Sequence, residues 1–171
     1  VSVSITPYKE APMLGIHYYK GHPNQYVAHY ADGRKKRAGA GISFLYYGPT
    51  STIVLVPLAS VDVPFIFNQV TADFQQVTIQ GQLTYRIIEP ERTAEVLNYS
   101  VGGADYAYIS EDPEKLSQRL VHLAQVLTRL ELDQLPLREA IRAADRVSAA
   151  VYGRMLQEPS IKLLGIEFMG Y

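Results

Sequence analysis

The most regular pattern in the chain runs from Gln76 to Ile87, where apolar and polar positions alternate without a slip. Successive side chains of a β-strand point to opposite faces, so this alternation predicts a half-buried strand. At about 3.3 Å per residue the strand would be roughly 40 Å long, which is long for a globular protein. Its predicted inward face carries Val77, Ile79, Gly81, Leu83, Tyr85 and Ile87.

The middle and the end of this strand carry further signals. Gly81 interrupts the apolar face and predicts a bend, a bulge or the close approach of another backbone. Pro90 ends the strand, because proline lacks an amide hydrogen and suits the first position of a helix. Residues 90–98 therefore predict a short helix with Ala94 and Leu97 turned inward.

Shorter strands are predicted on the N-terminal side of this element, where residues are rich in Tyr, Val and Ile. They cover residues 14–19, 25–31, 42–46, 52–58 and 61–67. The Asp-Gly pair at 32–33 predicts a hairpin turn. Pro64 cannot donate a hydrogen bond to a neighbouring strand, so its strand should lie at a sheet edge or carry a bulge. Residues 1–13 predict an extended lead-in.

A leucine-rich helix is predicted after a loop at residues 100–110. Its start at residues 112–114, Asp-Pro-Glu, combines a capping residue, a proline at the first position and a further acid. The leucines that follow recur every three or four residues and so form one apolar stripe. They are Leu116, Leu120, Leu123, Leu127 and Leu130.

A second helix is predicted over residues 136–156, opening at Pro136. Its apolar stripe consists of Leu137, Ile141, Ala144, Ser148, Val151 and Met155. Alternation over residues 161–168 then predicts a last strand that returns to the sheet. Strands, then helices, then one strand predict an α+β fold, a bent and mostly antiparallel sheet packed by two longer amphipathic helices and one short helix. We expect a single domain over residues 14–171.

The composition of the chain excludes only a few classes of function. A length of 171 residues favours one domain, and a net charge of −1 favours no particular partner. The absence of cysteine excludes disulfides and thiolate metal sites. Asp62 is the only charge between residues 37 and 73, which raises the alternative of a transmembrane helix. Glycines and prolines break that stretch, so it predicts buried strands instead.

A basic cluster follows the predicted hairpin turn and consists of Arg34, Lys35, Lys36 and Arg37. It could contact anionic lipid head groups or a partner, because each basic side chain gains about 1 kcal/mol near a charged membrane surface. It could also be a solvated hairpin end, since short charge runs are common at turns. A nucleic-acid site is not predicted, because no recognisable nucleic-acid-binding motif accompanies the cluster.

The histidines do not predict a metal site. His17, His22 and His29 could meet across a turn, but no carboxylate pattern completes a set of three or four ligands. We therefore predict neither a metal nor a cofactor. His122, beside the leucine stripe, is expected to be a partly buried structural residue.

Catalysis is not predicted either. No serine lies in a G-x-S-x-G motif, and the glycines at 39 and 41 lack the Lys-Ser/Thr of a phosphate-binding loop. The acids Asp73, Glu89 and Glu91 lie near the long strand, where Glu89 is expected to cap the short helix. No nucleophile, base and orienting group can be assembled from these residues.

Tyrosine is abundant, with thirteen copies in the chain. The pairs Tyr18-Tyr19 and Tyr46-Tyr47 lie on predicted strands, so one member of each should be exposed. Exposed tyrosines could form an aromatic belt at a membrane interface, or they could be ordinary sheet residues with a hydroxyl in solvent.

The order of these features resembles the SPFH or band 7 domain, the family of stomatins, prohibitins and flotillins. The resemblance covers roughly residues 15–169. It rests on the hairpin and Gly-rich entry, the long strand with its Pro exit, and two helices followed by a closing strand. These segments are YVAHYADGRKKRAGAGISFLYY, TADFQQVTIQGQLTYRIIEPERTAEVLNY and LLGIEF.

The resemblance implies a non-catalytic scaffold that is associated with a membrane, expected at its cytoplasmic face. Family members assemble side by side through this domain and a coiled coil into large homo-oligomers that organise membrane microdomains. A regulatory module that holds or encloses a membrane protease or another membrane client is the alternative that the family also implies. Because the family domain usually lies between a membrane anchor and a coiled coil, and neither is visible here, we expect the chain to be a piece of a longer protein.

Overall fold

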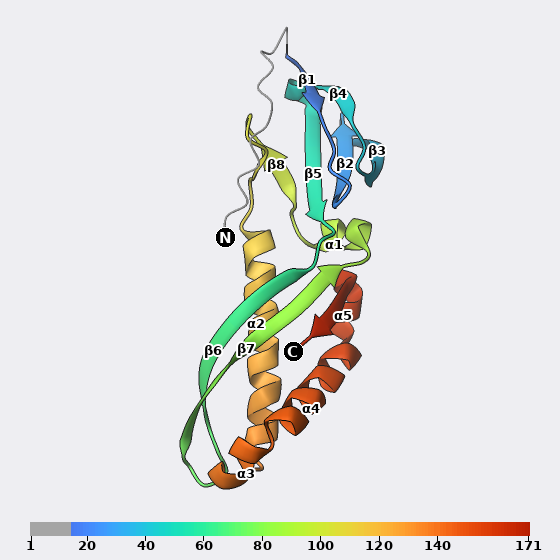
Figure 1. Ribbon diagram of the computed structural model, residues 1–171. Coiled ribbons are helices and arrows are strands. Elements are labelled where there is room, and N and C mark those ends of the chain that lie inside the picture. Colours follow the sequence, from blue (N-terminus) through green and yellow to red (C-terminus); the bar gives the residue numbers. More distant parts are fainter. Residues whose placement is uncertain (1–14) are drawn as a thin grey trace. The chain divides into compact units, whose positions relative to one another are not determined.

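The computed structural model describes residues 15–171, which form two compact units (Figure 1). The first unit comprises the described residues up to Pro57 together with Asn98–Glu111. The second comprises Leu58–Leu97 and Asp112–Tyr171. The range over which a single domain is predicted therefore contains two compact units, and the predicted lead-in at residues 1–13 lies outside the described residues.

The first unit consists of two antiparallel sheets. β1 pairs with β4, and a five-stranded sheet has the order β3-β2-β5-β8-β9. The strands are β1 (Ile16–Tyr19), β2 (Gln25–Ala31), β3 (Arg34–Ala40), β4 (Phe44–Tyr47), β5 (Ser51–Pro57), β8 (Ser100–Gly102) and β9 (Ala107–Tyr108), with a short 3-10 turn at Gly48–Thr50. The predicted hairpin turn is confirmed, since Asp32 (φ 52°) and Gly33 (φ 72°) both take the left-handed conformation that two-residue hairpins require.

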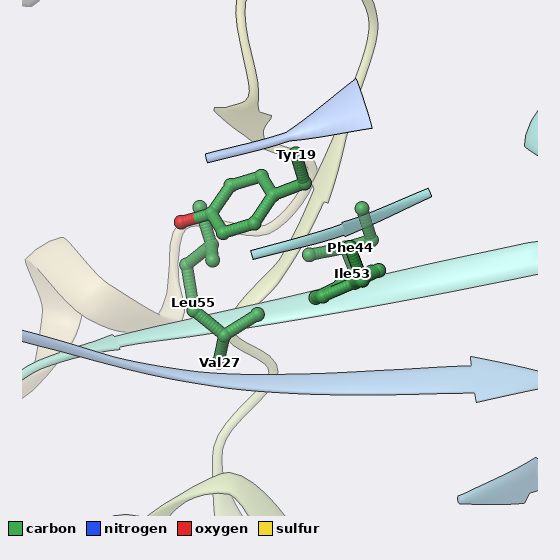
Figure 2. Packing of buried hydrophobic residues seen from close by; sticks show 5 residues of the cluster. All are labelled: Tyr19, Val27, Phe44, Ile53 and Leu55. Atoms are coloured by element: carbon green, nitrogen blue, oxygen red, sulfur yellow. The ribbon is translucent and has the colours of Figure 1, made fainter. Parts of the chain in front are cut away.

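The core of the first unit lies between these two sheets. Figure 2 shows its buried side chains pointing toward one another from β1, β2, β4 and β5. They are Tyr19, Val27, Phe44, Ile53 and Leu55. The Tyr19 and Phe44 rings lie 5.6 Å apart. One face of the small β1–β4 ribbon is thereby buried.

The second unit packs helices on a three-stranded antiparallel sheet of order β10-β7-β6. In Figure 1 the β6–β7 pair is a long curved hairpin with α2 alongside. The elements are β6 (Val61–Val70), β7 (Gln76–Ile87), α1 (Pro90–Val96), α2 (Asp112–Leu132), α3 (Leu137–Arg142), α4 (Ala144–Gln157), α5 (Pro159–Leu164) and β10 (Ile166–Gly170). The predicted α+β class is confirmed, although the strands are divided among three sheets instead of one.

The long strand β7 has the predicted bounds and is the centre of its sheet. Its second half is buried at Leu83, Tyr85 and Ile87, whereas Val77 and Ile79 are only half-buried. β6 is an edge strand, as Pro64 predicts.

Gly81 marks neither a bulge nor the close approach of another backbone, because β6 and β7 pair through it without a register shift and the atoms nearest to it belong to a side chain. It lies opposite Phe65 of β6, and a Cβ atom at Gly81 would lie 2.8 Å from the Phe65 ring. The absence of a side chain at Gly81 therefore leaves room for the Phe65 ring.

The predicted leucine stripe of α2 is correct only in its first half. Leu116 and Leu120 are buried, Leu123 and Leu127 are half-buried, and Leu130 is 46% exposed. The buried side of the helix continues through Ala124, Thr128 and Leu132. The Thr128 hydroxyl is tolerated there because it donates to the Ala124 carbonyl (2.7 Å).

The predicted second helix is two helices, α3 and α4, separated at Ala143. The break turns Ile141 (69% exposed) and Ala144 to solvent. Val151 and Met155 are buried as predicted, and Ala140 and Val147 complete the buried side. His122 on α2, expected to be partly buried, is exposed.

The predicted last strand begins late. Its first residues form α5, which ends at Gly165 in the left-handed conformation, and β10 starts at Ile166. β10 does return to the sheet, where it pairs with β7.

Candidate functional site

The β1–β4 ribbon has one face in the core and one face exposed, and the exposed face is apolar. In its register Ile16 lies opposite Tyr47, and Tyr18 lies opposite Leu45. Residues opposite each other in an antiparallel pair project to the same side of the sheet. These four side chains therefore share the face that points away from the core, and they are between 49% and 65% exposed. We call them the exposed ribbon face.

The tyrosine pairs behave as predicted, with one member of each exposed. Tyr18 (54%) and Tyr47 (49%) lie on the exposed ribbon face, whereas Tyr19 is buried and Tyr46 is half-buried. Burial, followed by the electrostatic effect of Tyr106 and Tyr108, raises the pKa of Tyr19 to about 12. The inward tyrosines are thus neutral core residues, and the outward ones are available for contacts.

An apolar group of this kind is informative because it is contiguous. Single exposed apolar residues are common on soluble proteins, but grouped ones mark interaction surfaces. Tyrosine adds a ring that is apolar along its body and polar at its tip, which suits a boundary between water and an apolar phase.

The basic cluster forms the first four residues of β3, directly after the turn at Asp32 and Gly33, so it lies at the end of the β2–β3 hairpin. Arg34, Lys35, Lys36 and Arg37 are all exposed along an edge strand of the five-stranded sheet. The register shifts beside them, so that Lys36 has no residue directly opposite on β2. Charged side chains on an edge strand hinder pairing with other strands. The cluster therefore hinders the pairing of β3 with another strand, and it also presents positive charge to solvent.

His29 connects this basic strand to the ribbon. It lies opposite Arg37, and its ring stacks on Phe44 of β4 at 4.9 Å between centroids. Burial above all, and then Arg37 and Lys36, lower the pKa of His29. The imidazole is therefore neutral at physiological pH, and the positive charge of this region comes from β3.

One protein-family model matches residues from both compact units of the chain. The model of the SPFH domain / Band 7 family matches residues 19–168, from the end of β1 to β10. The chain belongs to the SPFH domain / Band 7 family. In general this family comprises membrane-associated, non-catalytic scaffold domains. No curated protein matches the chain.

Residues 15–171 of this SPFH domain contain no helix that is long and apolar enough to span a membrane. The stretch between residues 37 and 73, in which Asp62 is the only charge, forms the end of β3 and all of β4, β5 and β6.

One Ser-His pair in this SPFH domain was not foreseen from the sequence. The Ser51 hydroxyl lies 2.9 Å from Nε2 of His29, a distance suited to a nucleophile and its base. In the described residues no hydrogen-bond partner reaches Nδ1 of His29, so the orienting acid of a catalytic triad is missing there. The basic neighbours Arg37 and Lys36 would also oppose a histidinium ion. The pair is best explained as a structural contact within the sheet, and neither residue lies in a motif that could have revealed it.

The other histidines of the candidate metal set lie in different surroundings. His17 stacks on Tyr46 at 5.4 Å, and His22 is exposed before β2. Among residues 15–171, no three His, Cys, Asp or Glu side chains are placed to hold a metal ion.

Two of the candidate acids stabilise local structure. Glu89 occupies the N-cap position of α1, but its side chain makes no capping hydrogen bond and instead forms an ion pair with Arg92 (2.9 Å). Asp73 lies in the β6–β7 turn, where it accepts the amide hydrogen of Leu137 (3.0 Å) and the hydroxyl hydrogen of Thr71. Asp73 thus caps α3 from a distant segment. Glu91 is exposed on α1.

The hydrogen bonds to Asp73 make stability depend on pH. The Thr71 hydroxyl, and to a lesser extent the Leu137 amide, hold the pKa of Asp73 below its ordinary value. A carboxyl depressed in this way stabilises the fold above its unfolded pKa, and that contribution is lost as the pH falls through its folded pKa.

We expect Asp73→Asn to lower the urea midpoint at neutral pH, and the difference from wild type to vanish in acid. Helical circular dichroism measures it, with Glu95→Gln, which removes an exposed carboxylate of α1, as control. A deficit that persisted in strong acid would show that the ionised carboxylate is not responsible.

Proposed function

We propose that this SPFH domain is a membrane scaffold at the cytoplasmic face, which self-associates into large homo-oligomers and organises membrane microdomains. The observation that carries the membrane part is the exposed ribbon face, where Ile16, Tyr18, Leu45 and Tyr47 lie side by side on one surface. In this proposal the face rests in the lipid interface, and Arg34–Arg37 contact anionic head groups. No substrate, metal or cofactor is required.

The energetics explain why self-association belongs to the proposal. Each basic residue contributes about 1 kcal/mol near an anionic leaflet. Four such residues and one small apolar face give one copy only weak, reversible binding. Copies joined side by side bind together, because each contact raises the effective concentration of the next at the surface.

Vesicle sedimentation tests the ribbon face. We expect the double variant Tyr18→Ser, Leu45→Ser to lose most binding to vesicles of phosphatidylcholine and phosphatidylserine. The matched control is Ile141→Ser, Leu163→Ser, which removes two side chains that are 69% and 67% exposed elsewhere in the chain. Equal binding by the ribbon variant and wild type would refute the proposed lipid contact.

The basic strand is tested in the same assay. Replacing Arg34–Arg37 by glutamate should abolish binding to the anionic vesicles. The control reverses four other exposed arginines and so changes the net charge equally. They are Arg119, Arg138, Arg142 and Arg146. If both quadruple variants lost binding alike, net charge and not β3 would be responsible.

A regulatory module for a membrane client is the second candidate, and the tip of the β6–β7 hairpin favours it. Phe74 is 89% exposed there and has a left-handed φ of 60°, which is unfavourable for a bulky residue. Purification of the full-length protein from membranes distinguishes the two functions. Large homo-oligomers alone support the scaffold, and one stoichiometric client protein supports the module.

A further inference from the structure

Most sheet edges in the described residues are protected against pairing with another strand. β3 carries the basic cluster, and β1, β4 and β9 have four residues or fewer. At β10, side chains of α4 bind backbone carbonyls, since Tyr152 donates to Phe168 (3.2 Å) and Ser148 donates to Tyr171 (2.7 Å), just after the strand. Charge, shortness and cover are the usual means by which proteins block edge pairing.

β6 differs from these strands. It is ten residues long and lies at the outer edge of its sheet. No other strand in residues 15–171 pairs with its free side. Its single charge, Asp62, accepts a hydrogen bond from Thr84 of the neighbouring β7 (2.7 Å). Exposed Ile66 (69%) and Val70 (42%) add apolar surface beside this edge.

The strand is also held in shape from its inner face. The Phe65 ring stacks on Phe67 at 5.1 Å and on Tyr171 at 5.3 Å. β6 pairs with β7 along its whole length, from Val61 to Val70, without a register shift. A rigid, extended edge gives up little conformational entropy when another strand is added to it.

We propose that β6 pairs antiparallel with β6 of a second copy of this chain, around a two-fold axis at Ile66. The inference rests on the proposed self-association and identifies a surface for it. With Ile66 opposite its own copy, Asp62 faces Val70 and Pro64 faces Asn68 of the second copy. The odd-numbered, inward side chains then continue the same face of the joined sheet.

The charge pattern selects a second copy in this orientation. Antiparallel pairing separates the two Asp62 carboxylates by roughly 26 Å, eight positions at about 3.3 Å each. Parallel pairing in register would place them side by side, which is unfavourable. Pro64 removes one donor from each edge, so the pairing contains one hydrogen bond fewer on either side of the axis.

Cysteine cross-linking tests the pairing with low background, because the chain contains no cysteine. We expect Ile66→Cys to form a covalent dimer with a short bis-maleimide at concentrations where the chain self-associates. Leu163→Cys, on a residue of similar exposure (67%), should remain monomeric.

Ile66→Lys brings two like charges together at the axis and should weaken dimerisation in sedimentation equilibrium about tenfold or more. Because Ile66 is exposed, these variants should keep the wild-type circular dichroism and thermal midpoint.

Several results would overturn the inference. Equal cross-linking at both positions, a dimer that Ile66→Lys leaves unchanged, or a chain that stays monomeric at all concentrations would each exclude β6 pairing. Weakening by Ile66→Lys without cross-linking of Ile66→Cys would mean that β6 meets a different strand. Vesicle binding and the size of the full-length assembly test the scaffold function independently of β6 pairing. Failure of the β6 proposal can therefore be distinguished from failure of the proposed scaffold function.

Discussion

Replacing Leu120 by alanine is expected to lower the free energy of unfolding by about 2 to 5 kcal/mol. Leu120 is 1% exposed on the buried side of α2, between Leu116 and Ala124. The truncation removes apolar contacts and leaves a cavity that a packed core fills only in part. Urea unfolding followed by helical circular dichroism measures the loss, and all five α-helices of the described residues lie in the second unit.

Leu130 is the matched control, because the leucine spacing places both residues on one stripe. Leu130 is 46% exposed, so Leu130→Ala should change the stability by no more than about 0.5 kcal/mol. Similar losses at both positions would mean that the helix buries the predicted stripe and not the side that the structure shows.

Replacing Gly165 by alanine is the second change with a large expected effect, a loss of about 2 kcal/mol or more. Gly165 has φ 67°, and an added Cβ would lie 2.6 Å from Cβ and 2.8 Å from the carbonyl oxygen of Glu89. Its own carbonyl accepts the amide hydrogens of Ile88 (2.9 Å) and Glu89 (3.0 Å). A shift that relieved the clash would therefore break the connection between the end of β7 and the start of β10.

At another glycine, replacement by alanine is expected to raise the stability. Gly153 lies inside α4, and an added Cβ would meet nothing within 4 Å. Gly153→Ala should raise the stability by about 0.5 to 1 kcal/mol, because alanine is the better helix former. Thermal and urea unfolding of both variants measure these two changes in stability. Stabilisation by Gly165→Ala would contradict the close approach of Glu89.

The strands were the most predictable elements. The alternation at β7 gave its bounds, and Pro64 indicated that β6 lies at an edge. Both signals are local, because the direction of a strand side chain and the missing donor of proline do not depend on distant residues. Strand alternation also predicted that one tyrosine of each adjacent pair is exposed, and the structure shows that these are Tyr18 and Tyr47.

The helices were less predictable, because their buried sides depend on what packs against them. Counting leucines placed Leu130 inward, whereas the structure buries Thr128, whose hydroxyl contacts that of Tyr171 (2.5 Å) forty-three residues away. The α3–α4 break at Ala143 likewise has no proline or glycine to signal it.

The candidate site shows the same division. The sequence by itself determined the strand alternation, the Asp-Gly turn and the basic run, since each is encoded within a few neighbouring residues. Only the tertiary structure decided that β1 pairs with β4, so that Tyr18 meets Leu45 on one exposed face. It also decided that Arg34–Arg37 lie on an edge strand, β3, and that β6 is an edge strand with an unpaired side in the described residues. Pairing between segments far apart in the chain depends on the whole core, and no local pattern specifies it.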